Sequence, residues 1–460
     1  MKSLRLFSPI ALSAFLFVAS AAAASRPNIL LIVSDDQGYA DVGFHGSKEV
    51  PTPHLDRLAA GGVVFTHGYV SHPFCSPTRA GLLTGRYQHR FGHENNPFYD
   101  PADKREGLPL SEKLLPEYLR AAGYATGWIG KWHLGATPEH KPSRRGFAET
   151  FGFIGGGHRF TNWSPNIATE YLVPIERNDA PVEVKEHLTT ALGREAAAFV
   201  TRHRAAPWFL YLAFNAPHSP NEPTPERLAR FASIADPKRR AYVAQVSLMD
   251  DAIGDTLAAL RASGQEERTL VFFFSDNGGP IGPNSSMNTP LRDAKGTVYE
   301  GGVRVPFVVR WPEKVKAGAR FEPAASSLDV FTTTLAAAGV PPPNDRVRDS
   351  VDLVPFLTGE KKGEPHAALF WRAQRGQWAV RTGAEGWKLV RQAGKPDELY
   401  KLSVDPAETT DLAAKEPARV AALSAQIAEW DKQMIPPVFG GLAARNDAKA
   451  AKKKAKTGKE

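Results

Sequence analysis

Continuous apolar runs alternate with amphipathic segments along the first three quarters of the chain. Residues 27–34 (PNILLIVS) and 208–214 (WFLYLAF) are rich in branched and aromatic side chains, which is typical of strands buried on both faces of a sheet. Further strands are predicted at 124–129, 269–274 and 305–310. Helices are predicted at 53–61, with Thr52 as the expected N-cap, and at 76–83, 110–122, 239–262 and 328–338. This order predicts an α/β fold with a large, mostly parallel sheet.

Clusters of polar residues follow four of the predicted strands. They read DDQG at 35–38, GKWH at 130–133, NAPH at 215–218 and SDNGG at 275–279. The carboxyl ends of parallel strands lie at one edge of a sheet, and ligands of open α/β sheets bind there. The clusters therefore predict one shared site.

The pattern changes after consecutive prolines at 341–343. Residues 368–371, 378–381 and 387–391 alternate as antiparallel strands do, and residues 417–434 predict an amphipathic helix. We therefore expect a smaller second domain made of a sheet and a helix. The expected parts of the chain are a leader at 1–24, a catalytic domain at 25–343, the smaller domain at 344–440 and a basic tail at 441–460.

The two ends of the chain differ from its body. Lys2 and Arg5 precede an apolar stretch at 10–18 and alanines at 22–24, which is the pattern of an export signal. This stretch is too short to span a bilayer, and no later one is long enough. We expect an exported protein, periplasmic or secreted, without stable membrane insertion.

The net charge of +8 at first suggests a polyanion partner, but residues 447–460 alone hold six lysines and two acids. Such a segment has too few apolar residues to fold. We expect a disordered, solubilising tail and no nucleic-acid binding.

Cysteine occurs once, at position 75. A lone cysteine forms no internal disulfide, and an exported thiol is open to oxidation. A small buried side chain that only fills space is the simplest explanation, but the neighbouring residues favour a functional role. The segment CSPTRAGLLTGR at 75–86 resembles the signature of the type I, formylglycine-dependent sulfatases, which is C-x-P-[S/T]-R followed by L-T-G-R.

The resemblance implies a chemistry for Cys75. In this family a formylglycine-generating or sulfatase-maturating enzyme oxidises the cysteine to an aldehyde, which hydrates to a geminal diol. One hydroxyl attacks sulfur to give a covalent sulfo-enzyme intermediate, and the other expels sulfate by re-forming the carbonyl. A helix N-terminus favours an anion, and Arg79, about one turn further on, can face the same site. The family fold is an alkaline-phosphatase-like α/β sandwich with a small C-terminal antiparallel sheet, in agreement with the element pattern.

The acidic residues after two strands predict a metal site. Asp35, Asp36, Asp276 and Asn277 offer oxygen ligands, which suit hard cations. Acids in loops are often only caps or turns, but both pairs match the sulfatase patterns D-D-x-G and D-N-G-G. The resemblance implies one divalent cation, Ca²⁺ with Mg²⁺ as the alternative, bound by these side chains together with residue 75.

Basic residues complete the resemblance. Lys131 and His133 lie in GKWHLG at 130–135, His218 in APHSP at 216–220 and Lys295 in KGTVYEGG at 295–302. The family implies that both lysines bind sulfate and that His133 assists sulfate release. It also implies that His218 contacts the substrate and is the general acid for the departing alcohol.

Specificity has no general motif in this family. His93, in RFGHEN at 90–95, and His158, in GGGH at 155–158, are candidate sugar contacts. Export and polar loops favour a sulfated carbohydrate, and the chain resembles carrageenan-type and N-acetylgalactosamine-6-sulfatase-type members. Two other functions stay open. One is a phosphomonoester or phosphodiester hydrolase of the same superfamily, and the other is a non-catalytic glycan-binding homologue in which Cys75 stays unconverted.

Overall fold

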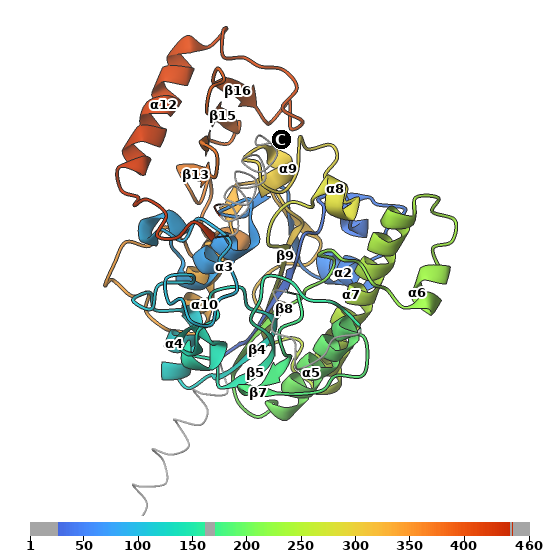
Figure 1. Ribbon diagram of the computed structural model, residues 1–460. Helices are drawn as coiled ribbons and strands as arrows, with labels where there is room; N and C mark the ends of the chain where they lie inside the picture. Colours follow the sequence, from blue (N-terminus) through green and yellow to red (C-terminus); the bar gives the residue numbers. More distant parts are fainter. Residues whose placement is uncertain (1–25, 162–170, 442–443, 445–460) are drawn as a thin grey trace, which may run out of the picture.

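The computed structural model describes residues 26–161, 171–441 and 444. A 10-stranded sheet crosses the molecule, with helices on both of its faces (Figure 1). In spatial order its strands are β11 (Ala319–Phe321), β2 (Val63–Phe65), β10 (Phe307–Arg310), β9 (Thr269–Ser275), β1 (Asn28–Ser34), β8 (Trp208–Ala213), β4 (Ala125–Lys131), β5 (Glu149–Phe153), β6 (Glu176–Arg177) and β7 (Ala180–Pro181). The predicted leader and nearly all of the predicted tail lie outside the described residues.

Neighbouring strands in the middle of this sheet run parallel. β1 pairs with β9 on one side and with β8 on the other, and β4 lies between β8 and β5 in the same direction. The large, mostly parallel sheet predicted from the sequence is therefore confirmed. The predicted strand at 305–310 is β10, which runs antiparallel to both β9 and β2.

Side chains of β1 alternate between two cores. Ile29, Leu31 and Val33 pack on the face that carries α3 (Cys75–Thr84), α4 (Leu115–Ala121) and α10 (Asp329–Ala337). Leu30 and Ile32 pack on the opposite face, which carries α2 (Pro53–Ala60), α5 (Leu188–Arg202) and α7 (Pro237–Ala262). A strand that is buried on both faces has no solvent-facing position, and this explains its continuous apolar run.

A small antiparallel sheet and one helix form the C-terminal part. The strands are β13 (Ala368–Ala373), β14 (Gln377–Thr382), β15 (Trp387–Gln392) and β16 (Glu398–Lys401), and the helix is α12 (Pro417–Asp431). Leu389 and Leu399 pack toward α12, whereas Val390 and Tyr400 belong to the core of the catalytic domain. The alternating pattern thus comes from a sheet held between α12 and the catalytic domain (Figure 1).

Short elements connect these parts. β3 (Gly68–Tyr69) pairs with β12 (Ala325–Ser326). The short helices are α6 (Pro225–Ala229), α8 (Ile281–Asn284), α9 (Glu300–Val303) and α11 (Val354–Leu357), together with the 3₁₀ turns η1 (Gly43–His45), η2 (Gln88–Phe91), η3 (Pro138–His140) and η4 (Pro142–Arg144). Within the described part of the chain, no helix combines the length and the apolar character that a membrane span requires.

Some predicted boundaries were wrong. The helix expected at 110–122 begins only at α4, with Pro116 in its first turn and the Leu114 N–H donating to Glu117 Oε2 at 2.6 Å. Thr52 does not cap α2 with its side chain. Asp250 of α7 does so instead, because its carboxylate accepts the His54 and Leu55 N–H groups at 3.0 and 2.9 Å. Such a cap comes from residues far apart in the sequence, so local patterns do not reveal it.

Candidate active site

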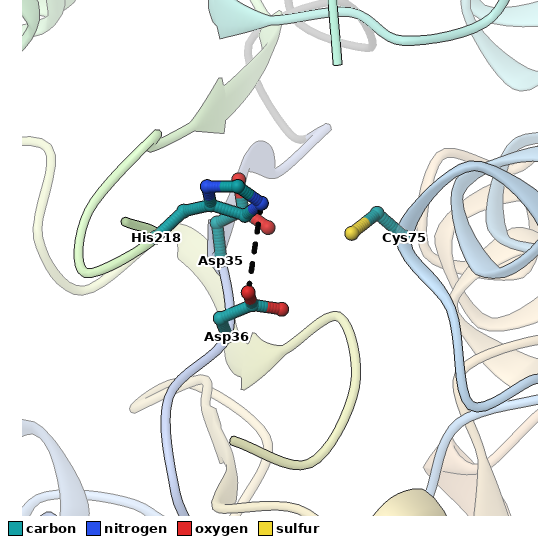
Figure 2. Close-up of side chains that lie close together, drawn as sticks. All are labelled: Asp35, Asp36, Cys75 and His218. Carbon is teal, nitrogen blue, oxygen red and sulfur yellow. Dashed lines mark ion pairs between the residues drawn. The ribbon is translucent and has the colours of Figure 1, made fainter. Parts of the chain in front are cut away.

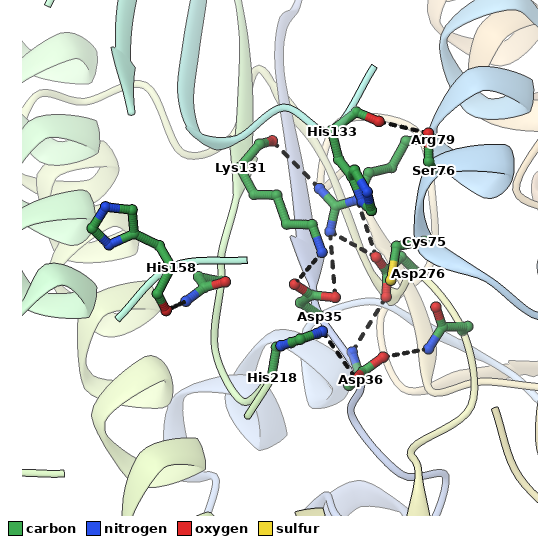
Figure 3. Close-up of polar contacts among 12 residues, drawn as sticks. Asp35, Asp36, Cys75, Ser76, Arg79, Lys131, His133, His158, His218 and Asp276 are labelled. Carbon is green, nitrogen blue, oxygen red and sulfur yellow. Dashed lines mark hydrogen bonds and ion pairs between the residues drawn. The ribbon is translucent and has the colours of Figure 1, made fainter. Parts of the chain in front are cut away.

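Neighbouring strands deliver the polar clusters to one place. The residues at these strand ends are Asp35 and Asp36 after β1, Asp276 and Asn277 after β9, Lys131 at the end of β4 with His133 beyond it, and His218 after β8. Because β9, β1, β8 and β4 are adjacent and parallel, their carboxyl ends meet at one edge of the sheet. Figure 3 shows these side chains gathered around Asp35 and Asp36.

The backbone around the site is unusual at three positions. Asp36 has φ 67° and His133 has φ 61°, a region that residues other than glycine seldom adopt and that occurs often at functional sites. Gly130 has φ 115°, and a Cβ there would lie 1.9 Å from the Ala213 carbonyl oxygen. The turn that carries Lys131 and His133 therefore requires glycine at position 130.

Cys75 is the first residue of α3, and its side chain points toward the carboxylates and His218 (Figure 2). It is 1% exposed, and its Sγ lies 3.2 Å from Lys295 Nζ. Burial raises the pKa of this thiol to about 12, against the lowering effect of Lys131 and Lys295. Because the thiolate is the nucleophilic form of cysteine, the unmodified side chain is a weak nucleophile at neutral pH.

Arg79 faces the same site from the next turn of α3. Its Nη2 and Nε donate to Asp276 Oδ2 at 2.7 and 3.0 Å, and its Nη1 donates to Tyr211 Oη at 3.2 Å. The side chain is fully buried, and burial acts to lower its pKa. Tyr211 and the carboxylates of Asp276 and Asp35 outweigh this effect and raise the pKa of Arg79 above its usual value. A permanent positive charge is thus fixed beside Cys75, as the helical spacing of these two residues predicted.

Asp35 and Asp36 are buried and have different partners. Lys131 Nζ lies 2.6 Å from Asp35 Oδ2, and Lys295 Nζ lies 2.5 Å from Asp36 Oδ1. Burial, with the charge of Asp276 adding to it, raises the pKa of Asp35 to about 7. Burial also acts to raise the pKa of Asp36, but Lys295 and His218 outweigh it and hold that pKa at about 2.

The acidic cluster fits a hard cation. Asp35 Oδ1 and Asn277 Oδ1 are buried, and neither has a hydrogen-bond partner among the described residues. Ligand atoms of Asp35, Asp36, Cys75 and His218 all lie within 4.8 Å of one another. Two of these four donors are carboxylate oxygens, and Asn277 Oδ1 adds an amide oxygen; oxygen is the ligand type that Ca²⁺ and Mg²⁺ prefer.

The two histidines differ in their contacts. His218 Nδ1 lies 2.6 Å from the Ser219 carbonyl oxygen, and its Nε2 lies 3.6 Å from Asp36 Oδ2. Since a carbonyl oxygen only accepts, Nδ1 carries a proton and Nε2 remains the nitrogen that can exchange one with a ligand. Burial lowers the pKa of His218 to about 4, although Asp36 opposes this effect. Both ring nitrogens of His133 lack hydrogen-bond partners among the described residues, and burial lowers its pKa well below the usual value.

His93 and His158, expected as sugar contacts, are fully buried side chains with protein partners. His93 Nε2 lies 2.6 Å from Ser76 Oγ, which itself donates to the His133 carbonyl oxygen at 2.5 Å. The ring nitrogens of His158 lie 2.6 and 2.8 Å from the carbonyl oxygens of Arg159 and Val173. In Figure 3 the His158 ring lies apart from the group around Asp35. Both rings therefore hydrogen-bond to other parts of the protein. Their contact with substrate stays a prediction.

Sequence reasoning missed two side chains that support the site. Tyr211 lies within β8 and accepts from Arg79, and Ser76 links α3 to the turn that carries His133. Tyr211 could have been found from the sequence, because it lies inside a continuous apolar strand and a buried hydroxyl needs a polar partner. Ser76 occupies a variable position of the signature, so its role had no such signal.

Comparisons with known proteins agree with this geometry. A family model described as Sulfatase matches residues 27–340. A second model, described as N-sulphoglucosamine sulphohydrolase, C-terminal, matches residues 293–433. The two matches overlap in the stretch that carries Lys295 and α9.

Individual relatives are similar over most of the chain. N-acetylgalactosamine-6-sulfatase of Canis lupus familiaris is 38% identical over 359 residues, which cover 74% of this chain and 67% of that protein. Arylsulfatase A of Bos taurus is 36% identical over 442 residues, which cover 86% and 85% of the two chains. A crystal structure of Ps i-CgsB in complex with k-i-k-neocarrahexaose superimposes with a TM-score of 0.87 at 36% identity, covering 92% of this chain and 96% of the other. The chain therefore belongs to the sulfatase family and is a sulfuric ester hydrolase.

Proposed function

We propose that this protein hydrolyses sulfate monoesters on a carbohydrate, through a formylglycine made from Cys75. The observation that carries the proposal is the position of Cys75 at the start of α3, with its Sγ 3.2 Å from Lys295 Nζ and its side chain facing three buried carboxylates. A sulfate group beside residue 75 would meet cationic side chains at close range. The burial of Cys75 disfavours its thiolate form. A hydrated aldehyde at this position can attack covalently without a thiolate.

Cationic side chains around residue 75 would receive the sulfate oxygens. Lys131 and Lys295 are held in place by Asp35 and Asp36, and their ammonium groups can each donate to an anion. Arg79 lies against Asp276 and is the permanent charge that stabilises an alkoxide formed on residue 75. Preorganised charges of this kind are often the largest contribution to catalysis in a buried site.

Asp35, Asp36, Asp276 and Asn277 would hold one divalent cation, for which Ca²⁺ is our choice and Mg²⁺ the alternative. When bound, it would polarise a sulfate oxygen and lower the pKa of the attacking hydroxyl. The buried oxygens of Asp35 and Asn277 that lack hydrogen-bond partners support this assignment. The cation and the lysines together balance the negative charge of the carboxylates and of the substrate.

Proton transfer falls to the two histidines. His218 Nε2 faces Asp36, and we assign to it the donation of a proton to the departing alcohol. Because burial lowers the pKa of this ring to about 4, the role requires that the negative charge of the bound sulfate ester raise that pKa, so that Nε2 carries a proton when the alcohol leaves. His133 lies on the β4 side of the site, and we assign to it the removal of a proton from the second hydroxyl of residue 75 as sulfate leaves. Each role is general acid–base catalysis by an imidazole.

Two relatives of different origin support the proposed substrate class. One is named N-acetylgalactosamine-6-sulfatase, and the other was crystallised with a neocarrahexaose. Both names point to sulfated sugars of the galactose type. We therefore place a sulfated galactan or a glycosaminoglycan fragment in the site.

The proposal is tested with converted enzyme and a panel of substrates. Sulfate release would be measured on carrageenan oligosaccharides, N-acetylgalactosamine 6-sulfate, glucosamine 6-sulfate and 4-nitrophenyl sulfate, with 4-nitrophenyl phosphate to test the phosphatase alternative. We expect the highest kcat/KM on a galactose-type sugar sulfate, and no release by Cys75→Ala. A preference for the glucosamine sulfate would contradict the substrate class, and faster phosphate than sulfate hydrolysis would contradict the reaction.

A further inference from the structure

Lys295 stands on a segment that the C-terminal sheet helps to hold. The carbonyl oxygen of the next residue, Gly296, accepts from Gln377 Nε2 of β14 at 3.0 Å. Upstream, Arg292 Nη1 donates to Tyr400 Oη at 2.7 Å and to the Glu408 carbonyl oxygen at 3.1 Å. The catalytic domain alone therefore does not define the position of Lys295.

A buried ion cluster lies just beyond this segment. Lys388 of β15 is fully buried, and its Nζ lies 2.8 Å from Glu300 Oε1 and 2.9 Å from Glu408 Oε1. Glu408 Oε2 accepts the Glu300 N–H at 2.7 Å, and Tyr69 donates to Glu300 Oε2 at 2.8 Å. Glu300 is the first residue of α9, so residues of the C-terminal part hold the start of this helix from outside the catalytic domain.

α9 in turn packs against two parts of the active site. The Gly278 N–H, next to Asn277, donates to the Gly302 carbonyl oxygen at 3.0 Å, and a Cβ at Gly278 would lie 1.8 Å from the Gly301 carbonyl oxygen. On the other side, a Cβ at Gly302 would lie 2.0 Å from the Thr297 carbonyl oxygen. With backbones in such close contact, a shift of α9 displaces the Lys295 turn.

Stability alone does not account for this cluster. Burying an ammonium group and two carboxylates carries a large desolvation cost, and apolar replacements of similar volume are often as stable. What such a cluster offers is a fixed geometry, because each carboxylate oxygen of Glu300 and Glu408 lies within 2.9 Å of a defined partner. The nearby function that needs fixed geometry is the contact of Lys295 with Cys75 and Asp36.

We propose that Lys388 and Glu408 are positioning residues, which fix Glu300 and α9 and thereby hold Lys295 against the sulfate group. This inference rests on the proposed sulfate-binding role of Lys295. In the described part of the chain, the side chains of Lys388 and Glu408 pair with each other and with Glu300, not with Cys75 or the acidic cluster, and they act through α9. The C-terminal sheet thus helps to position Lys295 in the sulfate site, in addition to covering the catalytic domain.

The test uses the converted full-length enzyme with 4-nitrophenyl sulfate as substrate and inorganic sulfate as a competing ligand. Lys388→Met should lower kcat/KM by about 10-fold or more, since small displacements of a positioning group cost up to about 100-fold. It should also raise the inhibition constant of inorganic sulfate by a factor close to that seen in Lys295→Ala. In the double variant Lys388→Met/Lys295→Ala the two losses should not multiply, because residues that act through one another are not additive.

Two further variants separate position from folding. Arg391 lies on the same strand, and its Nη2 donates to Asp397 Oδ2 at 2.6 Å in a more exposed ion pair. Arg391→Met removes this pair and should leave kcat/KM and the inhibition constant of inorganic sulfate unchanged. Gln377→Ala removes the hydrogen bond to the Gly296 carbonyl oxygen from a half-buried position, and it should weaken sulfate inhibition even if Lys388→Met fails to fold.

The outcomes distinguish this inference from the function it rests on. Wild-type sulfate inhibition and turnover in Lys295→Ala would remove the assumed role of Lys295, and the inference with it. An impaired Lys295→Ala beside an unimpaired Lys388→Met and Gln377→Ala would overturn the positioning role alone. Fully multiplicative losses in the double variant would also overturn it, because Lys388 would then act by another route.

Discussion

His133 and His218 reach the same centre from different strands, and their loss should have different consequences. A sugar alcohol leaves poorly without a proton, whereas nitrophenolate leaves well unaided. His218→Ala should therefore slow sugar sulfate hydrolysis by about 10² to 10⁴-fold and affect 4-nitrophenyl sulfate far less. His133→Ala should slow both substrates alike, because the covalent intermediate is common to them. Single-turnover and steady-state kinetics on both substrates measure the contrast.

The quantity that decides between the two roles is the loss of rate on the sugar sulfate relative to the loss on 4-nitrophenyl sulfate. Equal losses on both substrates in His218→Ala would show that the acid is a different residue. Lys295 would be the next candidate, since its Nζ lies near both Cys75 and Asp36. His187→Ala is a suitable control, because that ring caps α5 and contacts the Glu222 carbonyl oxygen, and neither contact involves a candidate site residue.

The residues that we propose to touch the reacting groups could be named from the sequence, and the residues that hold them in place could not. Cys75 and Lys131 lie in motifs whose flanking residues have geometric roles, such as the left-handed Gly130. Lys388 lies in a strand with no motif, and its importance depends on Glu300, which is far away in the sequence. No local pattern encodes a contact between such distant positions.

At the scale of elements, buried strands were the most predictable part. Residues 29–33 are all apolar because both faces of β1 are covered, and the polar residues at the strand ends then indicated where the site lies. α5 and β5 were not predicted, because small and polar residues dilute the periodicity of the helix and glycine interrupts the short strand. The direction of β10 was missed because antiparallel pairing leaves no mark on a short apolar run.

The loops after β1 and β9 should depend on a bound cation. They bring the carboxylates of Asp35, Asp36 and Asp276 together in a buried place, and a cation between the loops offsets their repulsion. Removal of the metal by a chelator should abolish turnover and lower the melting temperature, and Ca²⁺ should restore both. A free Ca²⁺ concentration of about 100 times Kd should raise the free energy of unfolding by about 2.7 kcal/mol.

Calorimetry and activity after metal removal measure this dependence. The control is Asp329→Asn, which alters a buried carboxylate at the start of α10 that accepts the Ser326 N–H, and it should leave the metal-dependent shift intact. Full activity and an unchanged melting temperature in protein shown to be metal-free would contradict the assignment of these loops.

At the scale of the whole molecule, the C-terminal sheet and the catalytic domain share one core. Val390 and Tyr400 belong to the same core cluster as Ile29 and Phe331 of the catalytic domain. The predicted boundary at 343 marks a change of pattern along the chain, but the core contacts cross it. The two parts are therefore packed together as one body.

The central claim is that residue 75 acts as a formylglycine, and peptide mass spectrometry measures this directly. The tryptic peptide that ends at Arg79 would be quantified in protein made with and without a maturation enzyme, together with turnover of 4-nitrophenyl sulfate. The aldehyde form differs from the thiol form by the exchange of sulfur for oxygen and the loss of two hydrogens. We expect turnover to rise in proportion to the aldehyde fraction and to be absent from protein that contains only the thiol. Full turnover by protein in which residue 75 is entirely cysteine would contradict it.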